Sequence, residues 1–104
     1  MEALLACGVT RVAYCPGSRN APFAYVLAEM ERRGRVECYP FAEERGAAFW
    51  AIGCLQGQGP GSGAVAVITT SGTAVAELHA AAEEAKRMRL PLILVTADRP
   101  FELR

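Results

Sequence analysis

The chain has 104 residues, 52% of them hydrophobic, and its 11 basic side chains balance its 11 acidic ones. This length allows one domain at most, which argues against a complete multi-step enzyme. The zero net charge gives no electrostatic indication of nucleic-acid or anionic-membrane partners, and the longest apolar runs fall far short of the roughly 18 residues that a membrane span needs. The first residues lack a secretory signal, so we expect a cytoplasmic protein, or a plastid one in a phototrophic eukaryote.

Helical and extended patterns alternate along the first part of the chain. Residues 1–7 have the pattern of the end of a helix, which Gly8 stops in the left-handed position. A short strand is predicted over residues 11–15. The turn-forming residues 16–20 break this strand and lead into a helix predicted over residues 21–33.

A second strand, over residues 35–41, leads into an unusual helix predicted over residues 43–56. Its segment 47–55 carries no charged residue, so we expect burial on all sides, either in a core or against another subunit. Glu43 and Glu44 stand at its start, where the partial positive charge of a helix N-terminus favours carboxylates. A carboxylate at the edge of such a helix loses water, which raises its pKa and allows it to share a proton with a ligand. Spacing alone does not distinguish the two glutamates.

The second part of the chain repeats the alternation after a glycine-rich loop at residues 57–63. The near-continuous apolar run at 64–69 predicts a strand that is covered on both faces. Residues 70–73 turn into a helix predicted over 74–88, and a fourth buried strand is predicted over 90–96. Buried strands joined by helical crossovers predict an α/β fold, with a parallel β-sheet sandwiched between helices.

The connections that follow the four predicted strands are expected to meet at one edge of this sheet, because the carboxyl ends of parallel strands face the same way. These connections are residues 16–20, 41–45, 70–73 and 98–100. Arg19 and Arg99 suit a substrate with carboxylates, which a guanidinium binds through paired hydrogen bonds, although surface salt bridges are an equal alternative. The hydroxyls and backbone N–H groups of residues 70–73 suit a polar or anionic ligand, or they simply cap the following helix.

The four cysteines and the single histidine form no recognisable metal or redox motif. Cys7, Cys15, Cys38 and Cys54 are widely and unequally spaced, without a Cys-x-x-Cys pair. We interpret them as small buried hydrophobes in a reducing compartment. His79 lies among alanines in a predicted helix and is given no catalytic role. We therefore expect no metal ligands in this chain.

Four short runs of the sequence together resemble the N-terminal region of one enzyme family. They are Cys-Pro-Gly-Ser-Arg-Asn-Ala-Pro at residues 15–22, Phe-Ala-Glu-Glu-Arg-Gly-Ala at 41–47, Thr-Ser-Gly-Thr-Ala-Val-Ala at 70–76, and Thr-Ala-Asp-Arg-Pro at 96–100 with Glu-Leu at 102–103. In this order they are similar to the 2-succinyl-5-enolpyruvyl-6-hydroxy-3-cyclohexene-1-carboxylate synthases, thiamine-diphosphate enzymes of menaquinone and phylloquinone biosynthesis. The runs cover nearly the whole chain.

The resemblance implies that residues 1–104 are most of the pyrimidine-binding domain of a longer transferase, and that its central and diphosphate-binding domains lie outside this sequence. Such enzymes bind thiamine diphosphate between this domain of one subunit and the diphosphate-binding domain of another, in homodimers or homotetramers. Mg²⁺ is held mainly by the second of these domains. The enzymes decarboxylate 2-oxoglutarate and add the succinyl semialdehyde unit to isochorismate. The chain alone is expected to be inactive.

The same resemblance implies roles for individual residues. Glu44 matches the family's glutamate, which hydrogen-bonds N1′ of the aminopyrimidine ring and thereby promotes deprotonation of the thiazolium carbon. The other matching positions are Thr70, Gly72 and Thr73 near the pyrimidine, and Ser18, Arg19 and Arg99 in the isochorismate pocket. The chain departs from the family pattern at Asn20, where serine is usual, and at Glu77, where asparagine is usual.

Two alternatives to this assignment stay open. One is another thiamine-diphosphate-dependent decarboxylase or synthase that acts on a different 2-oxo acid, against which the Pro-Gly-Ser-Arg and Asp-Arg-Pro runs count. The other is a non-catalytic α/β module that uses its apolar helix only for oligomerisation.

Overall fold

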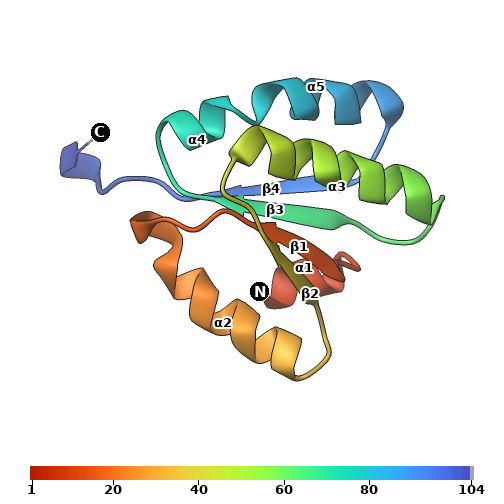
Figure 1. The fold of residues 1–104 in the computed structure, drawn as a ribbon, viewed down its shortest axis with the longest axis horizontal. Helices are drawn as coiled ribbons and strands as arrows, with labels where there is room; N and C mark the ends of the chain where they lie inside the picture. The colour runs from red at the N-terminus through yellow and green to blue at the C-terminus, as the bar shows by residue number, and fades with distance from the viewer. Residues whose placement is uncertain (104) are drawn as a thin grey trace.

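The computed structural model describes residues 1–103 and contains a four-stranded, all-parallel β-sheet (Figure 1). The strands are β1 (Arg11–Tyr14), β2 (Glu37–Pro40), β3 (Val65–Thr69) and β4 (Leu92–Thr96). Their order in the sheet is β2-β1-β3-β4, with β1 and β3 in the centre. The predicted α/β fold with a parallel sheet is confirmed.

Helices cover both faces of the sheet. On one face, α3 (Glu44–Gln58) and α5 (His79–Met88) lie side by side, and α2 (Ala21–Arg32) and the short α1 (Glu2–Ala6) lie on the other (Figure 1). Three short helical turns follow the carboxyl ends of strands: η1 (Ser18–Asn20), α4 (Thr73–Ala76) and η2 (Phe101–Leu103). In the described part of the chain, no helix combines the length and the apolar character that crossing a membrane requires.

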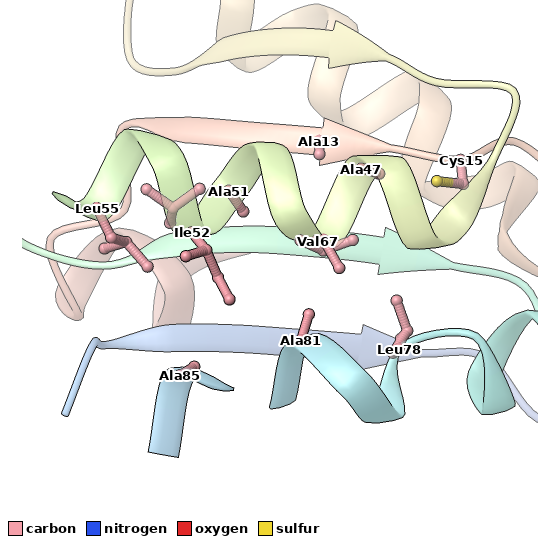
Figure 2. Close-up of a cluster of buried hydrophobic side chains, with 12 residues drawn as sticks. Ala13, Cys15, Ala47, Ala51, Ile52, Leu55, Val67, Leu78, Ala81 and Ala85 are labelled. Atoms are coloured by element: carbon pink, nitrogen blue, oxygen red, sulfur yellow. The ribbon is translucent and has the colours of Figure 1, made fainter. Parts of the chain in front are cut away.

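Two hydrophobic clusters fill the layers between the sheet and its helices. In the layer beneath α3 and α5, Ala47, Ala51 and Ala81 are fully buried (Figure 2). Their small side chains let the helices approach the sheet closely, as interior packing at crystal-like density requires. β3 is buried at each of its five residues, which confirms the prediction of a strand covered on both faces.

Two predicted elements differ from the structure. The single helix predicted over residues 74–88 is divided into α4 and α5. The break occurs next to Leu78, which is 2% exposed and packs into the cluster beneath α3. The fourth strand was predicted to be buried, but β4 is only half-buried. The reason is its place at the edge of the sheet, where β3 is its one partner among the described strands.

Helix α3 is buried on one side only. Its buried residues are Ala47, Ala48, Ala51, Ile52 and Leu55. Phe49 is 42% exposed, and Gly53 and Gln56 are exposed as well. Of the two predicted alternatives, burial of the whole helix in the core of this domain is therefore wrong, because a helix lying on a sheet can turn only one side toward it. Burial of the outer side against another subunit stays a prediction.

Candidate ligand site at the carboxyl edge of the sheet

The four connections lie at the same end of the molecule, beyond the carboxyl ends of the strands (Figure 1). Two close approaches join three of them. The loop after β1 packs against the loop after β3 at Gly17 and Thr70, and the loop after β3 approaches the segment after β4 at Gly72 and Arg99. Parallel topology therefore brings together segments that are far apart in the sequence, as predicted.

Gly17 marks the tightest of these approaches. A β-carbon at this position would lie 2.6 Å from the Cβ atom of Thr70 and 2.9 Å from its Oγ1 atom, so only glycine lets the two loops pack this closely. Gly72 has a φ of 78°, a left-handed conformation that favours glycine. A β-carbon there would lie 3.6 Å from Nη2 of Arg99. These two glycines allow the loops to converge.

The loop after β1 is held from within by Asn20, which is fully buried. Its Nδ2 donates to the backbone oxygen of Cys15 at 2.9 Å, and its Oδ1 accepts from the backbone N–H of Gly17 at 2.9 Å. The hydroxyl of Tyr14 donates to both Oδ1 and the backbone oxygen of Asn20, at 3.1 Å and 3.0 Å. Sequence reasoning saw in Asn20 only a turn-forming residue and a departure from a family pattern. An asparagine at the end of a Pro-Gly turn is the one signal that could have indicated such local bonding.

The structure separates the roles of the two glutamates at the start of α3. Glu43 is exposed and is the N-cap, and its carboxylate accepts from the backbone N–H groups of Arg45 at 3.0 Å and Gly46 at 2.7 Å. A β-carbon at Gly46 would lie 2.7 Å from Oε2 of Glu43, so this glycine makes room for the capping carboxylate. Glu44 is half-buried, and its carboxylate forms no hydrogen bond with another described residue. The dipole and capping interpretation therefore accounts for Glu43, and the carboxylate of Glu44 stays available to a ligand.

The buried thiol of Cys15 lies within the electrostatic influence of Glu44. Cys15 is 1% exposed, at the end of β1 beside the first turns of α3 (Figure 2). Burial, and then the negative charges of Glu44 and Glu43, raise the pKa of Cys15 to about 11. The thiol is therefore neutral at physiological pH. The Glu44 carboxylate therefore lies within electrostatic range of the end of β1.

The other cysteines agree only in part with the prediction of buried hydrophobes. All four are free, but Cys38 and Cys54 are half-buried and Cys7 is exposed. Cys7 is exposed because it follows the last turn of α1, a helix with no buried residue. His79, which was given no role, is exposed at the start of α5. Among residues 1–103, no three His, Cys, Asp or Glu side chains are arranged to hold a metal ion.

The remaining predicted site residues lie on the surface of this edge. Ser18 and Arg19 are exposed at the tip of the loop after β1, and Arg99 is exposed after β4. Neither arginine forms an ion pair with any other residue that the structure describes, so the salt-bridge alternative is not observed. Thr73 is exposed and begins α4, and the N-cap of that helix is Gly72, without a side-chain capping bond. The capping alternative for the hydroxyls is therefore not observed either.

Comparison with known proteins agrees with this arrangement. The family model described as "Thiamine pyrophosphate enzyme, N-terminal TPP binding domain" matches residues 1–104. The 2-succinyl-5-enolpyruvyl-6-hydroxy-3-cyclohexene-1-carboxylate synthase of Mycobacterium marinum is 46% identical over 103 residues, which are 99% of this chain and 18% of that protein. Proteins of the same name from Mycobacterium tuberculosis (strain H37Rv) and Paenarthrobacter aurescens are 46% and 49% identical over the same shares.

The chain thus spans about 18% of the length of the curated relatives that it matches. The aligned region covers nearly all of this chain, and it includes each of the four connections at the carboxyl edge of the sheet. The resemblance to these synthases is confirmed, and the chain belongs to the family of thiamine pyrophosphate enzymes, as their N-terminal cofactor-binding domain.

Proposed function

We propose that this chain is the pyrimidine-binding part of a longer synthase that decarboxylates 2-oxoglutarate and adds the succinyl semialdehyde unit to isochorismate, in menaquinone or phylloquinone biosynthesis. The names of the relatives support this reaction class. The observation that carries the proposal is the Glu44 carboxylate. It has no hydrogen-bond partner among the described residues, and Glu44 is half-buried as the first residue of α3, in the connection that follows β2.

The surroundings of Glu44 fit the aminopyrimidine ring of thiamine diphosphate. An apolar, poorly hydrated setting favours a carboxyl group that shares a proton with a ring nitrogen. Further along the same helix, Trp50 forms an aromatic group with Tyr39 and Phe41, at ring-centroid distances of 4.7 Å and 5.3 Å. Glu44 would hold a proton at N1′ of the ring, beside Thr70, Gly72 and Thr73. The cofactor, when bound, supplies the electron sink for decarboxylation and carbon–carbon bond formation.

Ser18, Arg19 and Arg99 are proposed to bind isochorismate. The two guanidinium groups are exposed at the same edge of the sheet and have no ion-pair partner among the described residues. Guanidinium groups bind carboxylates through paired hydrogen bonds, and isochorismate carries carboxylates. Ser18 adds a hydroxyl next to Arg19.

We propose that Mg²⁺ and the diphosphate group are held by a part of the longer protein that lies outside residues 1–104. It follows that the chain alone would be inactive. A cytoplasmic location is part of the same proposal.

The test is release of carbon dioxide from 2-oxoglutarate by the full-length protein, supplied with thiamine diphosphate and magnesium, with and without isochorismate. We expect turnover to depend on isochorismate, because the reaction needs it as acceptor. Formation of the succinyl-cyclohexene product is followed by mass spectrometry. Turnover of a different 2-oxo acid, with none of 2-oxoglutarate, would overturn the substrate assignment.

The exposed side of α3 is proposed to pack against a second subunit, because Phe49, a large hydrophobic side chain, is 42% exposed there. We expect Phe49→Ser to weaken self-association of the full-length protein by about tenfold or more, since burying one aromatic side chain contributes about 1.5–3 kcal/mol. Light scattering across a dilution series measures this change. Tyr25→Ser is the matched control, because Tyr25 is 80% exposed on α2, on the opposite side of the sheet. Equal dissociation constants for wild type and Phe49→Ser would rule out this interface.

A further inference from the structure

We infer that Tyr14 and Asn20 are positioning residues, which set the affinity for isochorismate by holding the loop that presents Ser18 and Arg19. This inference rests on the proposed function and deepens it. The structural basis is a group of four hydrogen bonds that join the end of β1 to the far end of the loop, from 2.9 Å to 3.1 Å in length.

Asn20 is the centre of this group. Within the described residues, Asn20 and Thr69 are the polar side chains that are fully buried, and an unsatisfied amide in such a place is costly. The amide of Asn20 is satisfied by the loop itself. Its nitrogen donates to the backbone oxygen of Cys15, at the start of the turn, and its oxygen accepts from the N–H of Gly17. The side chain thereby fixes the loop that carries Ser18 and Arg19.

Tyr14 holds Asn20 in turn. The hydroxyl donates toward both oxygens of Asn20, the backbone oxygen and Oδ1. Burial raises the pKa of Tyr14, so the hydroxyl keeps its proton and remains a donor at neutral pH. The Oδ1 atom of Asn20 therefore accepts two hydrogen bonds, one from the hydroxyl of Tyr14 and one from the backbone N–H of Gly17. The bond from Tyr14 orients Oδ1 for the bond from Gly17. Loss of the hydroxyl leaves one donor fewer for a buried acceptor.

Thr70 supports the same loop from the other side. Gly17 lies directly against its side chain, so the loop is held between Thr70 and the Asn20 amide. Ser18 and Arg19, next along the chain, are exposed. A flexible guanidinium loses entropy when a ligand immobilises it, and a preformed loop reduces this loss. The expected consequence is a lower KM for the carboxylate substrate, without an effect on cofactor activation.

The first experiment compares wild type with Tyr14→Phe in the full-length protein, because phenylalanine keeps the ring and removes only the hydroxyl. We expect the KM for isochorismate to rise about three- to tenfold, as for loss of one or two buried hydrogen bonds. The value of kcat and the thiamine diphosphate concentration for half-maximal activity should stay within about twofold of wild type. Asn20→Ala, which removes the amide from its buried site, should raise this KM further, by about ten- to hundredfold. Tyr25→Phe is the matched control and should match wild type, because Tyr25 is 80% exposed.

A second readout needs no substrate. The backbone N–H of Gly17 is bonded to the Asn20 side chain, so hydrogen exchange of a peptide that covers residues 15–20 reports on the loop directly. We expect faster exchange in Tyr14→Phe than in wild type, and unchanged exchange in Tyr25→Phe. Unchanged exchange and unchanged KM in Tyr14→Phe would overturn the inference, as would equal losses of affinity for isochorismate and for the cofactor. If turnover by the wild-type enzyme does not depend on isochorismate, this result contradicts the proposed function instead, before any variant is compared.

Discussion

Replacing Glu44 with glutamine is expected to reduce carbon dioxide release from 2-oxoglutarate by at least about a hundredfold in the full-length protein, as for loss of a proton-transfer group. Glutamine keeps the shape of the side chain and can still contact a ring nitrogen, but it cannot hold or release the proton. The glutamine side chain would occupy the same half-buried position as Glu44. We therefore expect the affinity for thiamine diphosphate to fall less than the rate of turnover. Single-turnover decarboxylation, with thiamine diphosphate binding followed separately by fluorescence, distinguishes the two effects.

Glu43→Gln is the matched control for this experiment. Glu43 is adjacent in sequence and undergoes the same chemical change, but its carboxylate caps α3 through the N–H groups of Arg45 and Gly46. An amide oxygen can still accept one of these bonds, so we expect a small loss of helix stability and turnover within about threefold of wild type. Full activity in Glu44→Gln, or equal losses of turnover in both variants, would show that Glu44 has no catalytic role and acts only as a favourable charge at the start of a helix.

Gly17→Ala is expected to have the second largest effect. Its β-carbon would overlap the side chain of Thr70, whose Cβ and Oγ1 atoms would lie 2.6 Å and 2.9 Å away. Overpacking of this kind costs about 1–3 kcal/mol, and moving the loop should also raise the KM for isochorismate about tenfold or more. Urea denaturation measures the free energy of unfolding, and initial rates measure the KM.

The cause of this effect can be isolated with a second substitution. Thr70→Gly removes the overlapping atoms, so the double variant Gly17→Ala/Thr70→Gly should regain part of the free energy of unfolding, as a positive coupling in a double-mutant cycle. Gly57→Ala is the control, because Gly57 lies in α3 with no atom within 4 Å of an added β-carbon. Alanine there should be neutral or slightly stabilising. Absence of coupling between positions 17 and 70 would show that the loops do not touch.

Much of the fold could be predicted from local sequence patterns. Some features depend on interactions between residues close together in the sequence, and these can be predicted from sequence alone. They are the apolar run of β3, the turn residues before α2, and Gly8 and Gly34 at helix ends. The predicted elements that failed depend on distant partners. β4 is half-buried because no described strand pairs with its outer edge, and the break after α4 occurs where Leu78 packs against the core beneath α3.

The sequence by itself determined the α/β class, the meeting of four connections at one edge and the family match, because parallel strands joined by helices place their carboxyl ends together. Only the tertiary structure showed that Glu43 caps α3, since capping depends on which carboxylate reaches the N–H groups of Arg45 and Gly46. It alone also revealed the buried amide of Asn20 beneath the hydroxyl of Tyr14. Hydrogen bonds and burial depend on three-dimensional distance, which residue spacing along a chain does not contain.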